Sequence, residues 1–216
     1  MLKILLVFSI LLSPVYLSSQ TDDNDFVPLG WNGKDAIKVY NTGNFSILER
    51  GDLFVGFKIS NSPDNYNWFN HSGYLPCLVT EFNRDSCVVR IMTFCDSANI
   101  EGKGFIIAYS RVSIHNCSKS RPAHLDPGEC NYFIKLNSLQ TDLIPPGKTV
   151  NHDFAVLAGC FDDAHLWPLK KRVSEVGDWD YHFYRMKTRW DDLLERESIE
   201  EVFTEDVTED PGMASK

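Results

Sequence analysis

The sequence lacks the short patterns that mark most catalytic and cofactor sites. Its 216 residues contain no phosphate-binding glycine loop, no Gly-x-Ser-x-Gly nucleophile elbow and no His-Glu-x-x-His zinc motif. No Cys-x-x-Cys occurs, which argues against a zinc or redox pair. Asp162, Asp163 and His165 lie close together, but their spacing suits the start of a helix better than a metal site. We therefore expect no metal, no cofactor and no catalytic residue in this chain.

Positive charge is also scarce. The formal net charge is −9, and the longest basic run is Lys170-Lys171-Arg172. A nucleic acid would be repelled by the chain as a whole, which excludes nucleic acid as a main partner.

Long hydrophobic runs are missing except near the start. Residues 1–20 combine Lys3, an apolar run from Ile4 to Leu12 and a Ser-rich flank, a pattern typical of a secretory signal peptide. The apolar run is shorter than the ~20 residues that span a bilayer, although an uncleaved membrane anchor is the alternative. We expect a secreted, extracellular protein with no membrane association after cleavage.

The cysteines of an exported chain predict disulfides rather than metal ligands. Cys87 and Cys95 fall on one predicted strand, ~26 Å apart at ~3.3 Å per residue, so they need different partners. Cys117 and Cys130 flank a loop rich in Pro, Gly and Ser, and we predict a bridge between them.

Three Asn-x-Ser sequons also fit export. They begin at Asn44, Asn70 and Asn116. Each is a candidate glycosylation site only where its side chain is exposed.

Apolar residues predict a succession of strands with turn residues between them; they alternate in most strands, whereas residues 87–95 are apolar on both faces, as in a central strand covered on two sides. The predicted strands cover residues 53–59, 87–95, 104–116, 131–137 and 149–160. No helix of useful length separates these strands, which excludes a parallel sheet with crossover helices. We expect a mostly β protein with an antiparallel β-sandwich over residues 21–160, in which residues 21–35 form an arm that leads into the fold.

The pattern becomes helical after Cys160. Residues 161–197 are predicted to form linker helices, and 198–216 an acidic, disordered tail. Within the second helix Trp179, Phe183, Met186, Trp190 and Leu193 recur at steps of four and three residues, as on one helical face.

One segment before the central strands is rich in aromatic and amide side chains. Residues 61–76 include Tyr66, Trp68, His71 and Tyr74, and flat rings beside polar donors suit sugar binding. These four are our candidate carbohydrate-binding residues. The alternative is a loop whose aromatics pack into the core.

Three stretches in order resemble a known family. Residues 88–116 resemble a paired-strand signature ending in Arg-Val-x-Val/Ile-x-Asn, 143–164 resemble a Pro-Gly turn and a strand before an acidic helix start, and 189–195, "RWDDLLE", is similar to a connecting helix. Together they resemble the N-terminal β-sandwich of six-hairpin glycoside hydrolases. In that family a sandwich, a helical linker and an (α/α)₆ barrel follow one another, and the catalytic acid and base lie in the barrel.

The resemblance implies a non-catalytic sandwich that supports carbohydrate binding or processing. Its partner would be carbohydrate, or a missing catalytic domain packed on the Trp179, Phe183 and Trp190 face. The alternative is a stand-alone secreted binding protein of β-sandwich type. A lipocalin-like carrier fits less well, because it needs eight strands around an open cavity.

Overall fold

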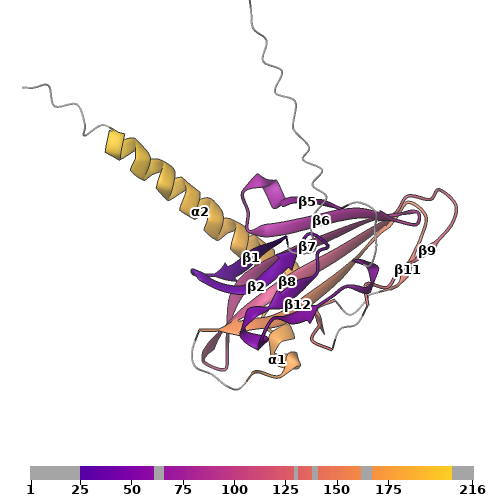
Figure 1. Ribbon diagram of the computed structural model, residues 1–216, viewed down its shortest axis with the longest axis horizontal. Coiled ribbons are helices and arrows are strands. Elements are labelled where there is room, and N and C mark those ends of the chain that lie inside the picture. The colour runs from indigo at the N-terminus through magenta and orange to yellow at the C-terminus, as the bar shows by residue number, and fades with distance from the viewer. Residues whose placement is uncertain (1–24, 61–65, 129–130, 138–140, 162–166, 206–216) are drawn as a thin grey trace, which may run out of the picture.

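The computed structural model describes residues 25–60, 66–128, 131–137, 141–161 and 167–205. The residues that the structure describes form two stacked antiparallel sheets, a separate pair of short strands, and a long helix preceded by a short one (Figure 1). The predicted fold class, mostly β with a helical region near the C-terminus, is confirmed. None of the helices described is long and apolar enough to cross a membrane.

The smaller sheet begins with a hairpin that the sequence analysis did not predict. Its strands run in the order β1 (Phe26–Trp31), β2 (Lys34–Tyr40), β3 (Phe45–Ile47) and β4 (Leu53–Val55). Asn32 and Gly33 join β1 to β2 with φ values of 52° and 76°, as a type I′ turn requires. The Asn-Gly pair thus favours a tight hairpin. For this reason part of residues 21–35, which we expected to be an arm, forms strand.

The larger sheet has its longest strands at the centre. Its strands, in spatial order, are β10 (Ile134–Lys135), β12 (Thr149–Cys160), β8 (Lys103–Asn116), β7 (Cys87–Ile100), β6 (Cys77–Arg84) and β5 (Asn67–Asn70). A separate pair joins β9 (Ala123–His124) to β11 (Leu143–Ile144). The three predicted strands that map to β7, β8 and β12 are confirmed, whereas β4 and β10 are shorter than predicted.

The central strand β7 is covered on both faces, as its apolar run indicates. Alternate side chains point to opposite faces of a strand. Ile91 faces the smaller sheet, where a Cβ added to Gly43 would come within 2.9 Å of its side chain. Phe94 faces the other way and meets the ring of Trp179 at 5.4 Å. The larger sheet is therefore the middle layer between the smaller sheet and a helix.

That helix is α2 (Trp179–Glu205), preceded by the short α1 (Lys170–Ser174). Asp178 caps α2, since its Oδ1 accepts a hydrogen bond from the Tyr181 N–H at 2.8 Å. Within the predicted linker 161–197, α1 covers five residues, and Leu169 just before it is 77% exposed. By contrast α2 extends through residues 198–205, which we expected to be tail, because glutamates favour helix and no Gly or Pro interrupts them.

The apolar stripe of α2 packs on the chain's own sheet. Trp179 and Met186 are buried, and Phe183 and Trp190 are half-buried against the core. The face expected to receive a missing domain is therefore already occupied over most of its length.

The cysteines divide into buried and exposed thiols. Cys77, Cys87 and Cys95 are buried, Cys117 is exposed, and Cys87 and Cys95 both lie on β7. Cys130 lies outside the described residues, so the bridge between Cys117 and Cys130 stays a prediction.

In the reduced chain without denaturant, we expect Cys117 to react with iodoacetamide long before Cys77 and Cys95. Burial raises the pKa of the Cys77 thiol to about 12 and also raises that of Cys95, so few reactive thiolates form there. Mass spectrometry of peptides after brief labelling measures the three rates, and a denatured sample is the control. Equal labelling of Cys95 and Cys117 in the native sample would contradict the described packing.

Candidate functional site

The candidate carbohydrate-binding residues do not share one surface. Tyr66 and Trp68 lie on the face of the larger sheet that the smaller sheet covers. Trp68 pairs with Thr80, and Thr80 pairs with Ile91, which faces the smaller sheet. The Tyr66 hydroxyl donates to the Ser60 carbonyl at 2.6 Å, and burial raises the pKa of Tyr66 to about 12. These two side chains act in packing, which is the alternative that the sequence left open.

His71 and Tyr74 lie on the opposite face, beside α2. The His71 ring meets Phe183 edge-on at 5.3 Å. The Tyr74 hydroxyl donates to Asp191 Oδ1 at 2.6 Å, and hydrogen bonds from Lys187 and Tyr74 lower the pKa of Asp191. This segment therefore contacts the smaller sheet on one face of the larger sheet and α2 on the other. Its four candidate side chains do not form one site.

The three sequons differ in exposure. Asn44 is buried, and its Oδ1 accepts a hydrogen bond from the Phe57 N–H at 2.8 Å. Asn116 is fully buried and donates to the carbonyls of Arg121 and Ile144. Asn70 is exposed. A glycan on either buried side chain would disrupt these contacts, so the glycosylation prediction now concerns Asn70 alone.

A buried polar chain links the larger sheet to α2. Asp96 of β7, Tyr109 of β8 and His182 of α2 each have 0% exposure. His182 Nδ1 lies 2.7 Å from Asp96 Oδ2, and His182 Nε2 lies 2.8 Å from the Tyr109 hydroxyl. Arg185 Nη2 donates to Asp96 Oδ1 at 2.9 Å and to the Ser97 carbonyl at 2.7 Å. Burial raises the pKa of Tyr109, which keeps this hydroxyl protonated.

The hydrogen-bonded series of Asp96, His182 and Tyr109 has the atom order of a proton relay, but all three side chains are closed to solvent. A substrate cannot reach three side chains that are fully buried, so the arrangement holds the helix rather than performing chemistry on a ligand. The sequence analysis missed it. The available signal is a histidine at position 182 inside the apolar stripe of Trp179, Phe183 and Met186, where an unpaired polar group would be costly.

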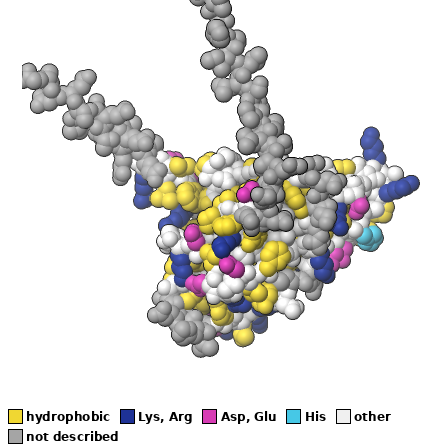
Figure 2. All heavy atoms as spheres, viewed as in Figure 1, with side chains coloured by type: hydrophobic (Ala, Val, Ile, Leu, Met, Phe, Trp, Pro, Cys, Tyr) yellow, Lys and Arg dark blue, Asp and Glu magenta, His cyan; other side chains and the backbone are white. Residues whose placement is uncertain are grey.

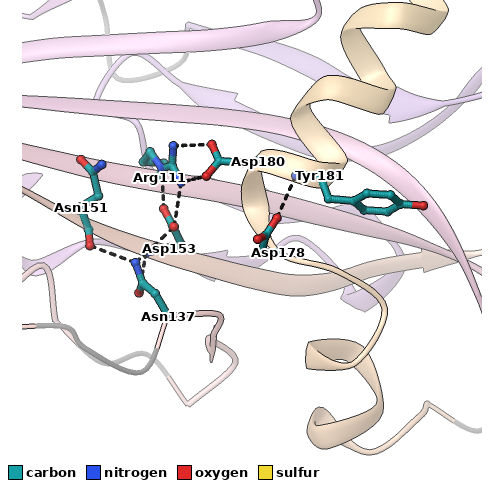
Figure 3. Close-up of polar contacts among 7 residues, drawn as sticks. All are labelled: Arg111, Asn137, Asn151, Asp153, Asp178, Asp180 and Tyr181. Carbon is teal, nitrogen blue, oxygen red and sulfur yellow. Dashed lines mark hydrogen bonds and ion pairs between the residues drawn. The ribbon is translucent and has the colours of Figure 1, made fainter.

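A second polar cluster fixes the start of α2. Arg111 of β8 donates to both carboxylate oxygens of Asp153 on β12, at 2.6 and 2.9 Å, and to both of Asp180 on α2, at 2.8 and 3.0 Å (Figure 3). Its guanidinium also lies 4.1 Å from the centre of the Trp179 ring. Asn137 supports Asp153 by donating to its Oδ2 at 3.2 Å. Arg111 thus joins two strands and the helix through bidentate contacts.

Glu81 and Asp85 are two carboxylates that flank the hairpin between β6 and β7, and a glycosidase would need such a pair to face one substrate. Glu81 forms an ion pair with Arg90 across neighbouring strands. Asp85 sits in the two-residue turn between β6 and β7, with a φ of 52°. This geometry supplies no acid and base facing a common substrate.

The groove beside α2 is open to solvent. It has a volume of about 560 Å³ and lies between the β1–β2 turn and the exposed side of α2. Three arginines line it: Arg185, Arg189 and Arg196. It is a candidate ligand site, and the sequence does not reveal it because its walls come from distant parts of the chain.

Comparisons with family models, with curated proteins and with solved structures found no match to this chain. The resemblance to six-hairpin glycoside hydrolases therefore rests on the three quoted stretches.

We expect His182→Ala to lower the free energy of unfolding by at least about 2 kcal/mol, because it removes the hydrogen bond to Asp96 Oδ2, takes away the partner of the Tyr109 hydroxyl and opens a cavity. Tyr184→Ala, on the same helix and 71% exposed, should stay within about 0.5 kcal/mol of the wild type. Urea denaturation measures both. Equal stability of the two variants would show that the buried chain contributes nothing to helix docking.

Proposed function

We propose that the chain is a secreted, non-catalytic β-sandwich module of a carbohydrate-processing protein. Its task is to hold α2 in a fixed direction as the connection to a catalytic body. The observation that carries this proposal is the docking of α2, through a buried polar chain and a bidentate arginine cluster, onto the larger sheet.

The shape of the helix supports a connecting role. With 27 residues, α2 is about 40 Å long at 1.5 Å per residue. Its contacts with the sheet come from its first half, from Asp180 to Asp191, and the rest projects away from both sheets (Figure 1). A helix anchored at one end and projecting at the other positions whatever follows it relative to the sandwich.

The state of the candidate catalytic groups supports a non-catalytic role. The relay-like chain of Asp96, His182 and Tyr109 is closed, and Glu81 is paired with Arg90. The family that the sequence resembles places its catalytic acid and base in a barrel, so a silent sandwich agrees with that resemblance.

A stand-alone secreted binding protein is the second candidate. The arginine-lined groove favours it, because a ligand could bind there without a further domain.

The two candidates are distinguished by expressing the chain alone and together with the coding sequence that follows it in the genome. We expect no hydrolysis of a panel of aryl glycosides by the chain alone and measurable hydrolysis by the extended protein. The control is the extended protein after removal of residues 21–205. Turnover by the chain alone that is lost in Glu81→Gln would overturn the proposal, and a stop codon directly after Lys216 would favour the stand-alone protein.

A further inference from the structure

The groove beside α2 is built from two elements that are far apart in sequence. Trp31 and Asn32 contribute one wall from the β1–β2 hairpin, and Tyr184, Arg189 and Arg196 contribute the other from α2. Its volume of about 560 Å³ falls within the range of small-ligand sites, roughly 300–1,000 Å³.

The charge of this groove opposes that of the chain as a whole. The lining holds three arginines and one acid, Asp192, whereas the formal net charge of the chain is −9. Figure 2 shows Lys and Arg side chains gathered where α2 leaves the body of the molecule. Asp96 offsets much of the charge of Arg185, so the attraction for an anion comes chiefly from Arg189 and Arg196.

The arginines are held in place to different degrees. Arg185 is anchored to Asp96 and the Ser97 carbonyl. Arg189 donates to Asn32 Oδ1 and lies over the Trp31 ring at 4.9 Å. Arg196 follows two turns further along the same side of the helix. Positioned guanidinium groups lose less entropy on binding than free ones, which favours recognition of carboxylate or sulfate groups.

Uncharged groups in the groove suit a sugar. The Tyr184 ring is 71% exposed and offers a flat apolar face, while Thr188 and Asn32 offer a hydroxyl and an amide. Asp192 can accept hydrogen bonds from sugar hydroxyls. The eleven steps of rise from Arg185 to Arg196 correspond to about 16 Å of helix, which is longer than one small anion.

We propose that this groove binds an acidic oligosaccharide, with its carboxylate or sulfate groups on Arg189 and Arg196 and a sugar ring on Tyr184. This inference goes beyond the proposed function, because it concerns a surface on the sandwich and needs no catalytic body. It holds or fails whether or not the chain is part of an enzyme.

The test is isothermal titration calorimetry of the full mature chain with four hexamers of different chemistry. We expect hexagalacturonate or a heparin-derived hexasaccharide to bind, and binding to weaken as NaCl rises from 50 to 300 mM. The two acidic sugars distinguish recognition of carboxylate from recognition of sulfate. Cellohexaose and hexaglutamate are the controls for sugar without charge and for charge without sugar.

Three variants locate the site. Arg196→Gln and Tyr184→Ala should each weaken binding of the acidic sugar about fivefold or more, since each removes one contact that water replaces incompletely. Lys119→Gln removes the same charge from an exposed residue outside the groove and should bind as the wild type does. Thermal unfolding confirms that all three variants fold.

The proposal is overturned by any of four results. These are no binding of either acidic sugar at millimolar concentration, wild-type affinity in both groove variants, an equal loss in Lys119→Gln, and equal affinity for hexaglutamate. Binding that requires the acidic sugar, Arg196 and Tyr184 supports it. None of these results depends on whether the extended protein hydrolyses glycosides.

Discussion

A carboxylate with no solvent exposure lies between the larger sheet and α2, and the position of the helix depends on it. Removing Asp96 from water costs several kcal/mol unless hydrogen bonds replace the lost hydration. The side chains that replace it, His182 and Arg185, both come from α2. A helix shifted by one residue would remove both of these side chains and leave the buried carboxylate with the Ser97 N–H, which donates to its Oδ1 at 2.7 Å. The cost of burying Asp96 therefore fixes the register of α2 on the sheet.

The apolar stripe could not do this by itself, because hydrophobic burial has no direction. Polar contacts at three places along α2 supply the direction. Asp180 meets Arg111 at the start, His182 meets Asp96 two residues later, and Asp191 meets Tyr74 further on. Three contacts spread along one axis define its orientation, while the stripe between them supplies most of the buried area. The rigid projection of α2 follows from this combination.

Much of this fold can be predicted from local periodicity. The apolar run in residues 87–95, the alternation in 104–116 and the stripe from Trp179 to Leu193 reflect burial that each segment carries in its own sequence. The pairing of Asp96 with His182 joins residues 86 positions apart, and no local pattern encodes it. The candidate sugar loop was misleading for a related reason. Trp68 and His71 are three positions apart but lie on opposite faces of the larger sheet, and the pairing of β5 with β6 and the contact with α2 are needed to show which face each one meets.

The shape of the groove beside α2 also depends on the pairing of the buried Asp96 with His182 and Arg185. One wall is the β1–β2 hairpin of the smaller sheet and the other is α2, and these two elements cover opposite faces of the larger sheet. They meet only near the end of β7, where Arg189 reaches Asn32 across 157 residues of sequence. Because Arg185 both anchors the helix to Asp96 and lines the groove, a change that loosens the buried carboxylate also moves a groove wall. The contact that orients the helix thus also sets the distance between the arginines of α2 and the β1–β2 hairpin, which is the width of the groove available to an anionic ligand.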